Sequence, residues 1–233
     1  MPAPPWCGPA RVPTTSWQDC GVSQPKWALV VPAKPLTAAK SRLRGALPGV
    51  PHEELALALA ADTVRAARAC PLVADVLLVT DDVRVGALAR KLGARVLPDL
   101  PAAGLNAAFS YGADIAGPGW VAGLTADLPA LRPAELADAL RVAQDGPPVR
   151  RYVADAPGDG TVLLTAPPGL ALEPRFGVRS AAAHAASGAL PMTGGWPSLR
   201  RDVDTPADLA AAARLGLGPR TAALTVDHAA AAG

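Results

Sequence analysis

The sequence predicts an α/β fold of three layers, in which helices cover both faces of a mostly parallel sheet that also carries one antiparallel hairpin. Apolar runs of strand length alternate with segments of helical periodicity between residues 26 and 219, and this alternation is typical of parallel sheets. Residues 150–167 interrupt it with two β-type runs joined by Pro-Gly-Asp-Gly, which predicts a hairpin. Half of the residues are hydrophobic, enough for one sizeable core.

The elements of the first half follow from local patterns. WALVVPA is an apolar run that ends at prolines, and the segment after it carries apolar residues at helical spacing. A later helix closes on Gly93, where a C-terminal glycine is typical. The predicted elements are strands over 27–33, 73–82 and 94–99, and helices over 52–70, 83–93 and 104–117.

The second half begins with another apolar strand and a clean helix before the hairpin. Its last helix starts with a capping box, in which Thr205 is the cap, Pro206 is the first helical residue and Asp208 closes the box. The predicted elements are strands over 120–131 and 199–206, the hairpin over 150–167, and helices over 132–146, 178–188 and 205–215. We expect residues 26–219 to form a single domain between flexible tails over 1–25 and 220–233.

The composition narrows the functional classes. A net charge of +2 over 233 residues gives no reason to expect a nucleic-acid footprint. No apolar run reaches the roughly 18–20 residues that a membrane span needs, and the first 25 residues lack the pattern of a secretion signal. Three cysteines and three histidines are scattered without metal-ligand spacing. We therefore expect a cytoplasmic protein with no zinc site, no nucleic-acid partner and no membrane contact.

A cluster of cations follows the first strand. Lys34, Lys40 and Arg42 lie in a stretch that contains no acid between Asp19 and Glu53. A solvated surface is the usual explanation of a charge run, but surfaces normally intersperse both signs. Ligands of open parallel sheets bind beyond the carboxyl ends of the strands, so we interpret these cations as a site for a small anion.

Acids follow several later strands. Asp127 has apolar neighbours and would be costly to bury without a partner. Asp202 and Asp204 precede the last helix, and the cap at Thr205 explains neither of them. Asp81–Asp82 are instead explained by a helix cap. Carboxylates that face a cationic loop suit a magnesium–nucleotide site, in which Asp127 and either Asp202 or Asp204 bind Mg²⁺.

Several catalytic motifs are missing from the sequence. It contains no GxxxxGK[ST] loop, no GxGxxG after a strand and no GxSxG elbow. A reaction that needs no protein base fits this inventory best. A phosphate monoester has a second pKa of about 6 and is already mostly ionised at neutral pH. Its attack on the α-phosphorus of a nucleotide needs mainly alignment and charge neutralisation.

An ordered set of segments resembles a known family. These segments are VPAKPLTAAKSRL, LLVTDD, GLNAAF, LTADLPAL, GDGTVLLTA, PRFGVRSAAAHAASGA and LRRDVDTPADL, and the resemblance covers roughly residues 26–219. Together they resemble the guanylyltransferases that activate a three-carbon phosphoacid in the biosynthesis of coenzyme F420. The resemblance implies a nucleotidyltransferase (glycosyltransferase-A-like) fold. For the actinobacterial branch, which the Ala-rich composition suggests, it implies GTP and phosphoenolpyruvate as substrates.

The resemblance also implies a role for each matching residue. In this interpretation GTP phosphates are held by Lys34, Lys40 and Arg42, the nucleoside by Asn106, Mg²⁺ by Asp127 with Asp202 or Asp204, and phosphoenolpyruvate by Thr161, Gly177 and Ser180. The product would be enolpyruvoyl-2-diphospho-5'-guanosine, which a downstream transferase of the same pathway would use.

Two positions depart from the family pattern. Ala126 stands where a glycine often precedes the aspartate, and Ala181 stands where a second serine often follows Ser180. The missing hydroxyl leaves the acceptor open among phosphoenolpyruvate, 2-phospho-L-lactate and 3-phosphoglycerate. Two other functions remain as alternatives: a transferase of the same fold that uses a sugar phosphate, and a non-catalytic nucleotide-binding subunit. His184, one helical turn after Ser180, is a further candidate for the acceptor pocket.

Overall fold

The computed structural model of the protein describes residues 26–100 and 102–231, so the tail predicted over 1–25 lies outside it. The strands are β1 (Trp27–Pro32), β2 (Val73–Val79), β3 (Arg95–Leu97), β4 (Trp120–Leu124), β5 (Arg151–Ala154), β6 (Thr161–Ala166) and β7 (Leu190–Pro191). The helices are η1 (Ser41–Leu43), α1 (His52–Ala69), α2 (Val83–Lys91), α3 (Leu105–Ala116), α4 (Pro133–Asp145), α5 (Ser180–Ala186), α6 (Pro206–Leu215) and α7 (Pro219–Ala231). Within the described ranges, no helix has the length and apolar character needed to cross a membrane.

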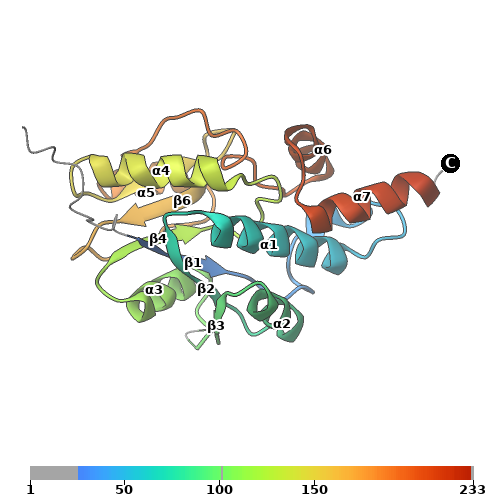
Figure 1. Cartoon of the computed structure of the whole chain (residues 1–233), viewed down its shortest axis with the longest axis horizontal. Helices are drawn as coiled ribbons and strands as arrows, with labels where there is room; N and C mark the ends of the chain where they lie inside the picture. Colours follow the sequence, from blue (N-terminus) through green and yellow to red (C-terminus); the bar gives the residue numbers. More distant parts are fainter. Residues whose placement is uncertain (1–25, 101, 232–233) are drawn as a thin grey trace, which may run out of the picture.

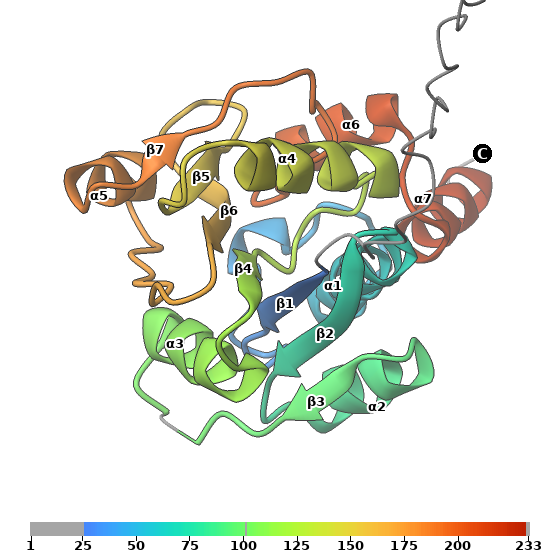
Figure 2. The ribbon, with the colours of Figure 1, turned by 60° about the vertical axis from the view of Figure 1, so that its left-hand side comes forward.

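The described strands form one sheet in the order β3-β2-β1-β4-β6-β5-β7. Strand β1 pairs in parallel with both β2 and β4, while β6 pairs antiparallel with both β4 and β5. Figure 2 shows β3 and α2 at one edge of the sheet, and β7 and α5 at the other. The mostly parallel sheet with an antiparallel hairpin confirms the predicted fold class.

Helices cover both faces of the sheet (Figure 1). On one face, Leu29 and Val31 belong to the same buried cluster as residues of α1, α2 and α4. On the other face, Val30 belongs to a cluster with residues of α3 and α5. This alternation along β1 follows from the two-residue period of a strand, and it explains why a central strand reads as a continuous apolar run.

Helix α3 lies unusually close to β1 at Gly112. A Cβ atom added at Gly112 would lie 2.3 Å from Cγ1 of Val30, which is far inside van der Waals contact. The glycine inside this helix is therefore a packing requirement. Its place in the fold fixes α3 against the strand that leads into the cationic loop.

The strand predicted over 199–206 is wrong. Residues 201–203 have no regular secondary structure, and Val203 makes a main-chain hydrogen bond of 3.1 Å to Asp127. Leu199 and Val203 are both fully buried, which produced the strand-like apolar signal. Arg200 between them donates to the carbonyl oxygens of Ala154 and Asp155. The segment is thus a buried loop that is held by side-chain bonds.

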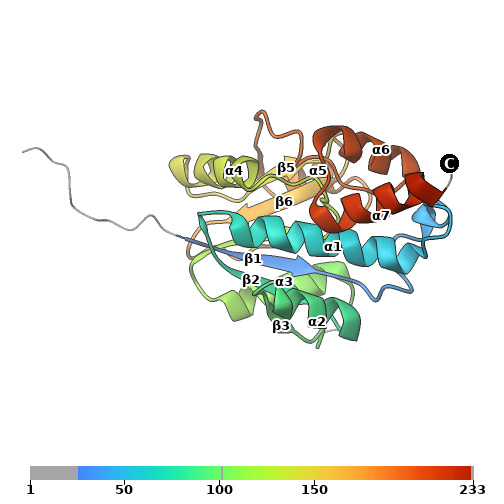
Figure 3. The same cartoon turned by 45° about the vertical axis from the view of Figure 1, so that its right-hand side comes forward.

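Residues 219–231 form helix α7 instead of the flexible tail predicted from residue 220. The carboxylate of Asp62, in the middle of α1, accepts from the main-chain N–H groups of Arg220 (3.2 Å) and Thr221 (2.8 Å). These bonds satisfy amides that a helix N-terminus leaves unpaired. Figure 3 shows α7 lying alongside α1. Because Asp62 is remote in sequence, no local pattern near residue 220 could reveal this cap.

Candidate active site

The site lies where the parallel strands β1 and β4 end side by side. The loop after β1 carries Lys34, Lys40 and Arg42, and the loop after β4 carries Asp127. Because the two strands are parallel neighbours, their carboxyl ends deliver both loops to the same edge of the sheet.

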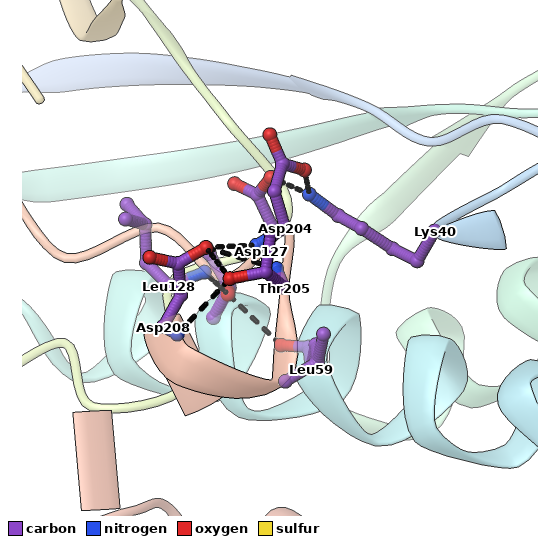
Figure 4. A network of polar contacts seen from close by, with 8 residues as sticks. Lys40, Leu59, Asp127, Leu128, Asp204, Thr205 and Asp208 are labelled. Carbon is purple, nitrogen blue, oxygen red and sulfur yellow. Dashed lines mark hydrogen bonds and ion pairs between the residues drawn. The ribbon is translucent and has the colours of Figure 1, made fainter. Parts of the chain in front are cut away.

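The structure brings Lys40 together with two of the predicted acids. The Lys40 ammonium is hydrogen-bonded to the carboxylates of both Asp127 and Asp204 (Figure 4). Lys40 itself has a left-handed backbone, with φ 53° and ψ 40°, a conformation that a residue with a Cβ atom rarely adopts. Burial alone would lower the Lys40 pKa, but the charges of Asp127 and Asp204 outweigh it and raise the pKa above its ordinary value. Lys40 is therefore a permanent cation in this state.

The loop that carries Lys40 is anchored by Asp82. One carboxylate oxygen of Asp82 accepts from the N–H of Leu36 at 2.9 Å, and the other accepts from Arg84 and Val85 in the first turn of α2. Burial opposes ionisation of this group, yet these amide bonds hold its pKa below the ordinary value. The predicted helix cap is confirmed, and the bond to Leu36 adds an anchoring role that the sequence did not indicate.

Asp127 is held rigidly from both sides. The N–H of Leu128 donates to Thr63 Oγ1 of α1 at 2.8 Å, and the Asp127 carbonyl accepts from Val203 at 3.1 Å. Its Oδ1 atom is buried, and no described residue donates a hydrogen bond to it. An orphaned carboxylate oxygen beside a second carboxylate suits a hard cation.

Asp202 lies near the same acids without joining the ion pair. Burial raises its pKa to about 7, and the charges of Asp127, Asp155 and Asp204 act in the same direction, while Lys40 opposes them. Within residues 26–100 and 102–231, no group of three His, Cys, Asp or Glu side chains converges on one point as a metal site. Asp127 and Asp204, which already share one cation, are thus the carboxylates that fit Mg²⁺. This ion commonly takes one or two carboxylates and completes its shell with substrate phosphates and water.

Two cavities meet at the Lys40–Asp204 pair. The first, of about 340 Å³, contains Lys34 and Asp127 and is otherwise walled largely by small and apolar side chains of the loop after β1, of α1 and of α3. The second, of about 490 Å³, contains Arg42 and lies towards the hairpin and α5. Only Lys40 and Asp204 line both cavities. The three cations predicted to act together are therefore distributed: Lys34 on one side, Arg42 on the other and Lys40 between them.

The second cavity collects the residues predicted for the acceptor. Thr161, Gly177 and Ser180 all line it, and Thr161 and Ser180 are almost fully buried. Gly177 has φ 139°, a backbone conformation that side chains disfavour. The cavity also contains Asp155, which the sequence did not single out. Its carboxylate accepts from the N–H groups of three turn residues at 2.7–3.0 Å and so builds the Pro-Gly-Asp-Gly turn.

Asn106 differs from its expected role. Its carboxamide accepts from the N–H of Phe176 at 2.7 Å and donates to the carbonyl of the same residue at 3.0 Å. Both polar atoms are therefore engaged, and Asn106 lines neither cavity. In this structure it ties α3 to the segment that leads to Gly177, so it positions the second cavity instead of contacting the first.

An α/β sheet with two cavities that meet at a lysine and an aspartate suits a transferase that brings two anionic substrates together. Residues 27–187 match the family model "Guanylyl transferase CofC like". The chain belongs to this family of guanylyl transferases.

Curated relatives agree with this assignment. The chain is 71% identical over 198 residues to a phosphoenolpyruvate guanylyltransferase of Salinispora arenicola, with 85% of this chain and 92% of that protein covered. It is 54% identical over 203 residues to a protein of the same name from Geodermatophilus obscurus, with 85% and 93% covered.

Among solved structures, a putative nucleotide-diphospho-sugar transferase from Desulfovibrio desulfuricans G20 is similar at TM-score 0.63 and 15% identity. The alignment covers 88% of this chain and 95% of that one. At this identity the likeness concerns the fold alone, and it agrees with the predicted nucleotidyltransferase architecture.

Proposed function

We propose that this protein condenses phosphoenolpyruvate with GTP, forming enolpyruvoyl-2-diphospho-5'-guanosine and pyrophosphate for coenzyme F420 biosynthesis. The observation that carries the proposal is the meeting of two cavities at Lys40 and Asp204. A reaction that joins two anionic substrates needs two pockets with cations between them. The names of the curated relatives support the choice of GTP and phosphoenolpyruvate.

The first cavity suits GTP. Its small and apolar walls leave room for a flat base and ribose, while Lys34 and Lys40 supply charge at the end that faces Asp127. With GTP in this orientation, its phosphates extend towards the wall that the two cavities share. The second cavity suits phosphoenolpyruvate where Arg42 and the hydroxyls of Thr161 and Ser180 can bind phosphate and carboxylate oxygens. Four carboxylates also line this cavity, so the anion needs the cations beside it: Asp155, Asp159, Asp202 and Asp204.

The bonds that change are both at phosphorus. An ionised phosphate oxygen of phosphoenolpyruvate attacks the α-phosphorus of GTP, and the bond from that phosphorus to the β-phosphate bridging oxygen breaks. Lys40 and Arg42 align the two substrates and offset the charge that is brought together. No protein base is required, because the attacking oxygen is already deprotonated at neutral pH.

Asp127 and Asp204 would hold Mg²⁺, with Asp202 near enough to interact with it electrostatically. When bound, Mg²⁺ supplies positive charge that neutralises the polyphosphate and the departing pyrophosphate. In this proposal Lys40 exchanges its carboxylate partners for phosphate oxygens as the substrates arrive. The activated product, a mixed diphosphate, would then be consumed by a downstream transferase.

Pyrophosphate release tests this function. The protein incubated with GTP, phosphoenolpyruvate and Mg²⁺ should release pyrophosphate, and Asp127→Asn should lower kcat by about 100-fold or more, as expected when a group that stabilises transferred charge is lost. Asp138→Asn is a matched control, because Asp138 is an exposed acid of α4 paired only with Arg141. An Asp127→Asn variant as fast as the parent would refute the metal assignment.

The acceptor is tested by mass spectrometry of the product. Incubation of GTP with an equal mixture of phosphoenolpyruvate, 2-phospho-L-lactate and 3-phosphoglycerate should give the enolpyruvoyl product as the main species. A dominant product from either other acid would assign a different acceptor to the same site. GTP binding without pyrophosphate release from any acceptor, a sugar phosphate included, would indicate a non-catalytic subunit.

A further inference from the structure

A buried histidine lies directly behind the acceptor cavity. His184, on α5, has no exposed surface. Its Nδ1 atom lies 3.0 Å from Thr161 Oγ1, and its Nε2 atom lies 2.9 Å from the main-chain nitrogen of Arg175. Thr161 lines the second cavity, whereas His184 does not. The histidine therefore acts on a ligand through its neighbours, of which Thr161 is the one whose side chain it contacts in the cavity wall.

The contact with Arg175 determines the tautomer of His184. A main-chain N–H can only donate, so Nε2 must present its lone pair to Arg175. In the neutral ring the proton then resides on Nδ1, and Nδ1–H donates to Thr161 Oγ1. The Thr161 hydroxyl thus accepts from His184.

A hydroxyl that already accepts one hydrogen bond still has its own hydrogen to donate. Among the described residues, none accepts a hydrogen bond from Thr161 Oγ1. We infer that His184 is a positioning residue that fixes the Thr161 hydroxyl as a hydrogen-bond donor to an anionic oxygen of the acceptor. This inference deepens the proposed function and rests on it for the identity of the ligand.

The surroundings keep the ring neutral and in place. Burial lowers the His184 pKa to about 4, and the nearby charges of Arg175 and Arg150 act in the same direction, while a hydrogen bond from the ring to the main chain of Ser180 opposes them. The ring of Phe176 meets His184 edge-on, with centroids 5.1 Å apart, and Tyr152 lies on another side at 6.0 Å. The tautomer is therefore unchanged at neutral pH, and so is the direction of the Thr161 bond.

The consequence is selectivity for anions. A threonine hydroxyl that is free to rotate can either donate or accept, so it tolerates acceptor and donor groups alike. With His184 behind it, Thr161 presents only a donor to the cavity. Phosphate and carboxylate oxygens satisfy that donor, whereas a ligand that offers only a donor at this point leaves two donors facing each other.

The tautomer can be observed directly in the full-length protein. Nitrogen-15 NMR of histidine-labelled protein distinguishes a ring protonated on Nδ1 from one protonated on Nε2. The chain contains three histidines, and spectra of His184→Asn and His52→Asn assign the relevant signal. We expect a neutral ring with the proton on Nδ1. A neutral ring with the proton on Nε2, or a charged ring at neutral pH, would overturn the inference without any reference to activity.

Kinetics test the consequence for the acceptor. Thr161→Val should raise the KM for phosphoenolpyruvate by about 10-fold or more, the expected loss for one hydrogen bond to a charged group, with the KM for GTP little changed. Thr161→Ser retains the hydroxyl and should show a much smaller rise. His184→Gln can accept from Arg175 but places no donor at Nδ1, so it should raise this KM by less than Thr161→Val, because the freed Thr161 hydroxyl can still rotate to donate. His184→Asn places an amide nitrogen near the Nδ1 position and should be milder.

The double variant separates positioning from general destabilisation. In the Thr161→Val background, His184→Gln should raise the acceptor KM little further, because the bond it disrupts is already absent. Equal effects of His184→Gln with and without Thr161 would refute the inference. Failure of every acceptor to release pyrophosphate would instead refute the proposed function, while the NMR result would still decide the orientation of Thr161.

Discussion

Lys40 forms ion pairs with two carboxylates, those of Asp127 and Asp204. Its ammonium neutralises Asp127 and Asp204, which would otherwise repel each other. The sequence predicted that cations from the first loop and acids from later loops would meet, and the structure confirms this for Lys40, Asp127 and Asp204. The sequence did not predict that Lys40 would form ion pairs with both acids, since this depends on the direction of each side chain.

Replacing Lys40 tests whether it competes with a metal ion for these carboxylates. Lys40→Met should bind Mg²⁺ or Mn²⁺ about 10-fold more tightly without GTP, because displacing an ion pair would no longer oppose binding by the order of 1–2 kcal/mol. Isothermal titration calorimetry measures this affinity. Lys34→Met is the control, as Lys34 lines the first cavity but makes no ion pair with either acid. Unchanged affinity in Lys40→Met would exclude competition.

His184 also predicts how stability depends on pH. Its pKa falls from an ordinary 6.5 to about 4 in the folded state, so the unfolded chain binds the proton more readily. Stability is therefore fully present above pH 6.5 and is lost as the pH falls towards 4, by up to about 3 kcal/mol. Urea unfolding at several pH values across this range gives the free energy of unfolding at each pH. This free energy should fall less steeply with decreasing pH for His184→Asn than for the parent. Identical slopes would mean that the ring is protonated in the folded protein.

At the scale of elements, strands and helices were predicted best where a local signal carries them. The run WALVVPA, the Gly93 helix end and the Thr205 capping box all appear as expected, the last with the bond from Asp208 N–H to Thr205 Oγ1 at 3.3 Å. The failures have non-local causes. The loop predicted as a strand is held by hydrogen bonds from Arg200 and Val203 to residues far away in the sequence. Helix α7 is capped by Asp62, which is equally remote from it in the sequence.

The contact between α3 and β1 predicts a strict requirement for glycine. Gly112→Ala places a methyl group 2.3 Å from Val30 Cγ1, and we expect a loss of about 1–3 kcal/mol in the free energy of unfolding from overpacking. Gly119→Ala, where no atom lies within 4 Å of the added Cβ, should change it little. Urea denaturation of both variants provides the measurement. Equal stability of the two would show that α3 can move away from the sheet.

The cap of α7 predicts a local loss of order. Asp62→Ala leaves two buried or half-buried amides without an acceptor, which should reduce stability by about 1–3 kcal/mol. Amide hydrogen exchange should accelerate first in residues 219–225. Asp62→Asn keeps one acceptor oxygen and should be intermediate. Uniform acceleration throughout the protein would indicate instead that Asp62 supports the core of α1.

For the whole molecule, the sequence predicted the layout of the site because strand ends converge in a parallel sheet. Lys40 and Asp127 were therefore identified before any spatial information, whereas Thr161 was named only from the resemblance to a known family. The distribution of these side chains between the two cavities was not predictable. Arg42 lines the second cavity with Thr161, whereas Lys34 lines the first. Asn106 is hydrogen-bonded to the main chain of Phe176. Side-chain directions in the segment over 33–51 depend on backbone details such as the left-handed Lys40, which residue types alone do not specify.

The antiparallel strand β6 makes the protein modular. Beyond β4 the acceptor side is built mainly from one contiguous stretch, residues 151–191, which is joined to the parallel part of the sheet through the pairing of β4 with β6. Under the proposed function, substitutions confined to that stretch would change the pocket around Thr161 and Ser180 and leave the loops after β1 and β4 as they are. The choice of acid and the handling of the nucleotide would then be separable by mutation.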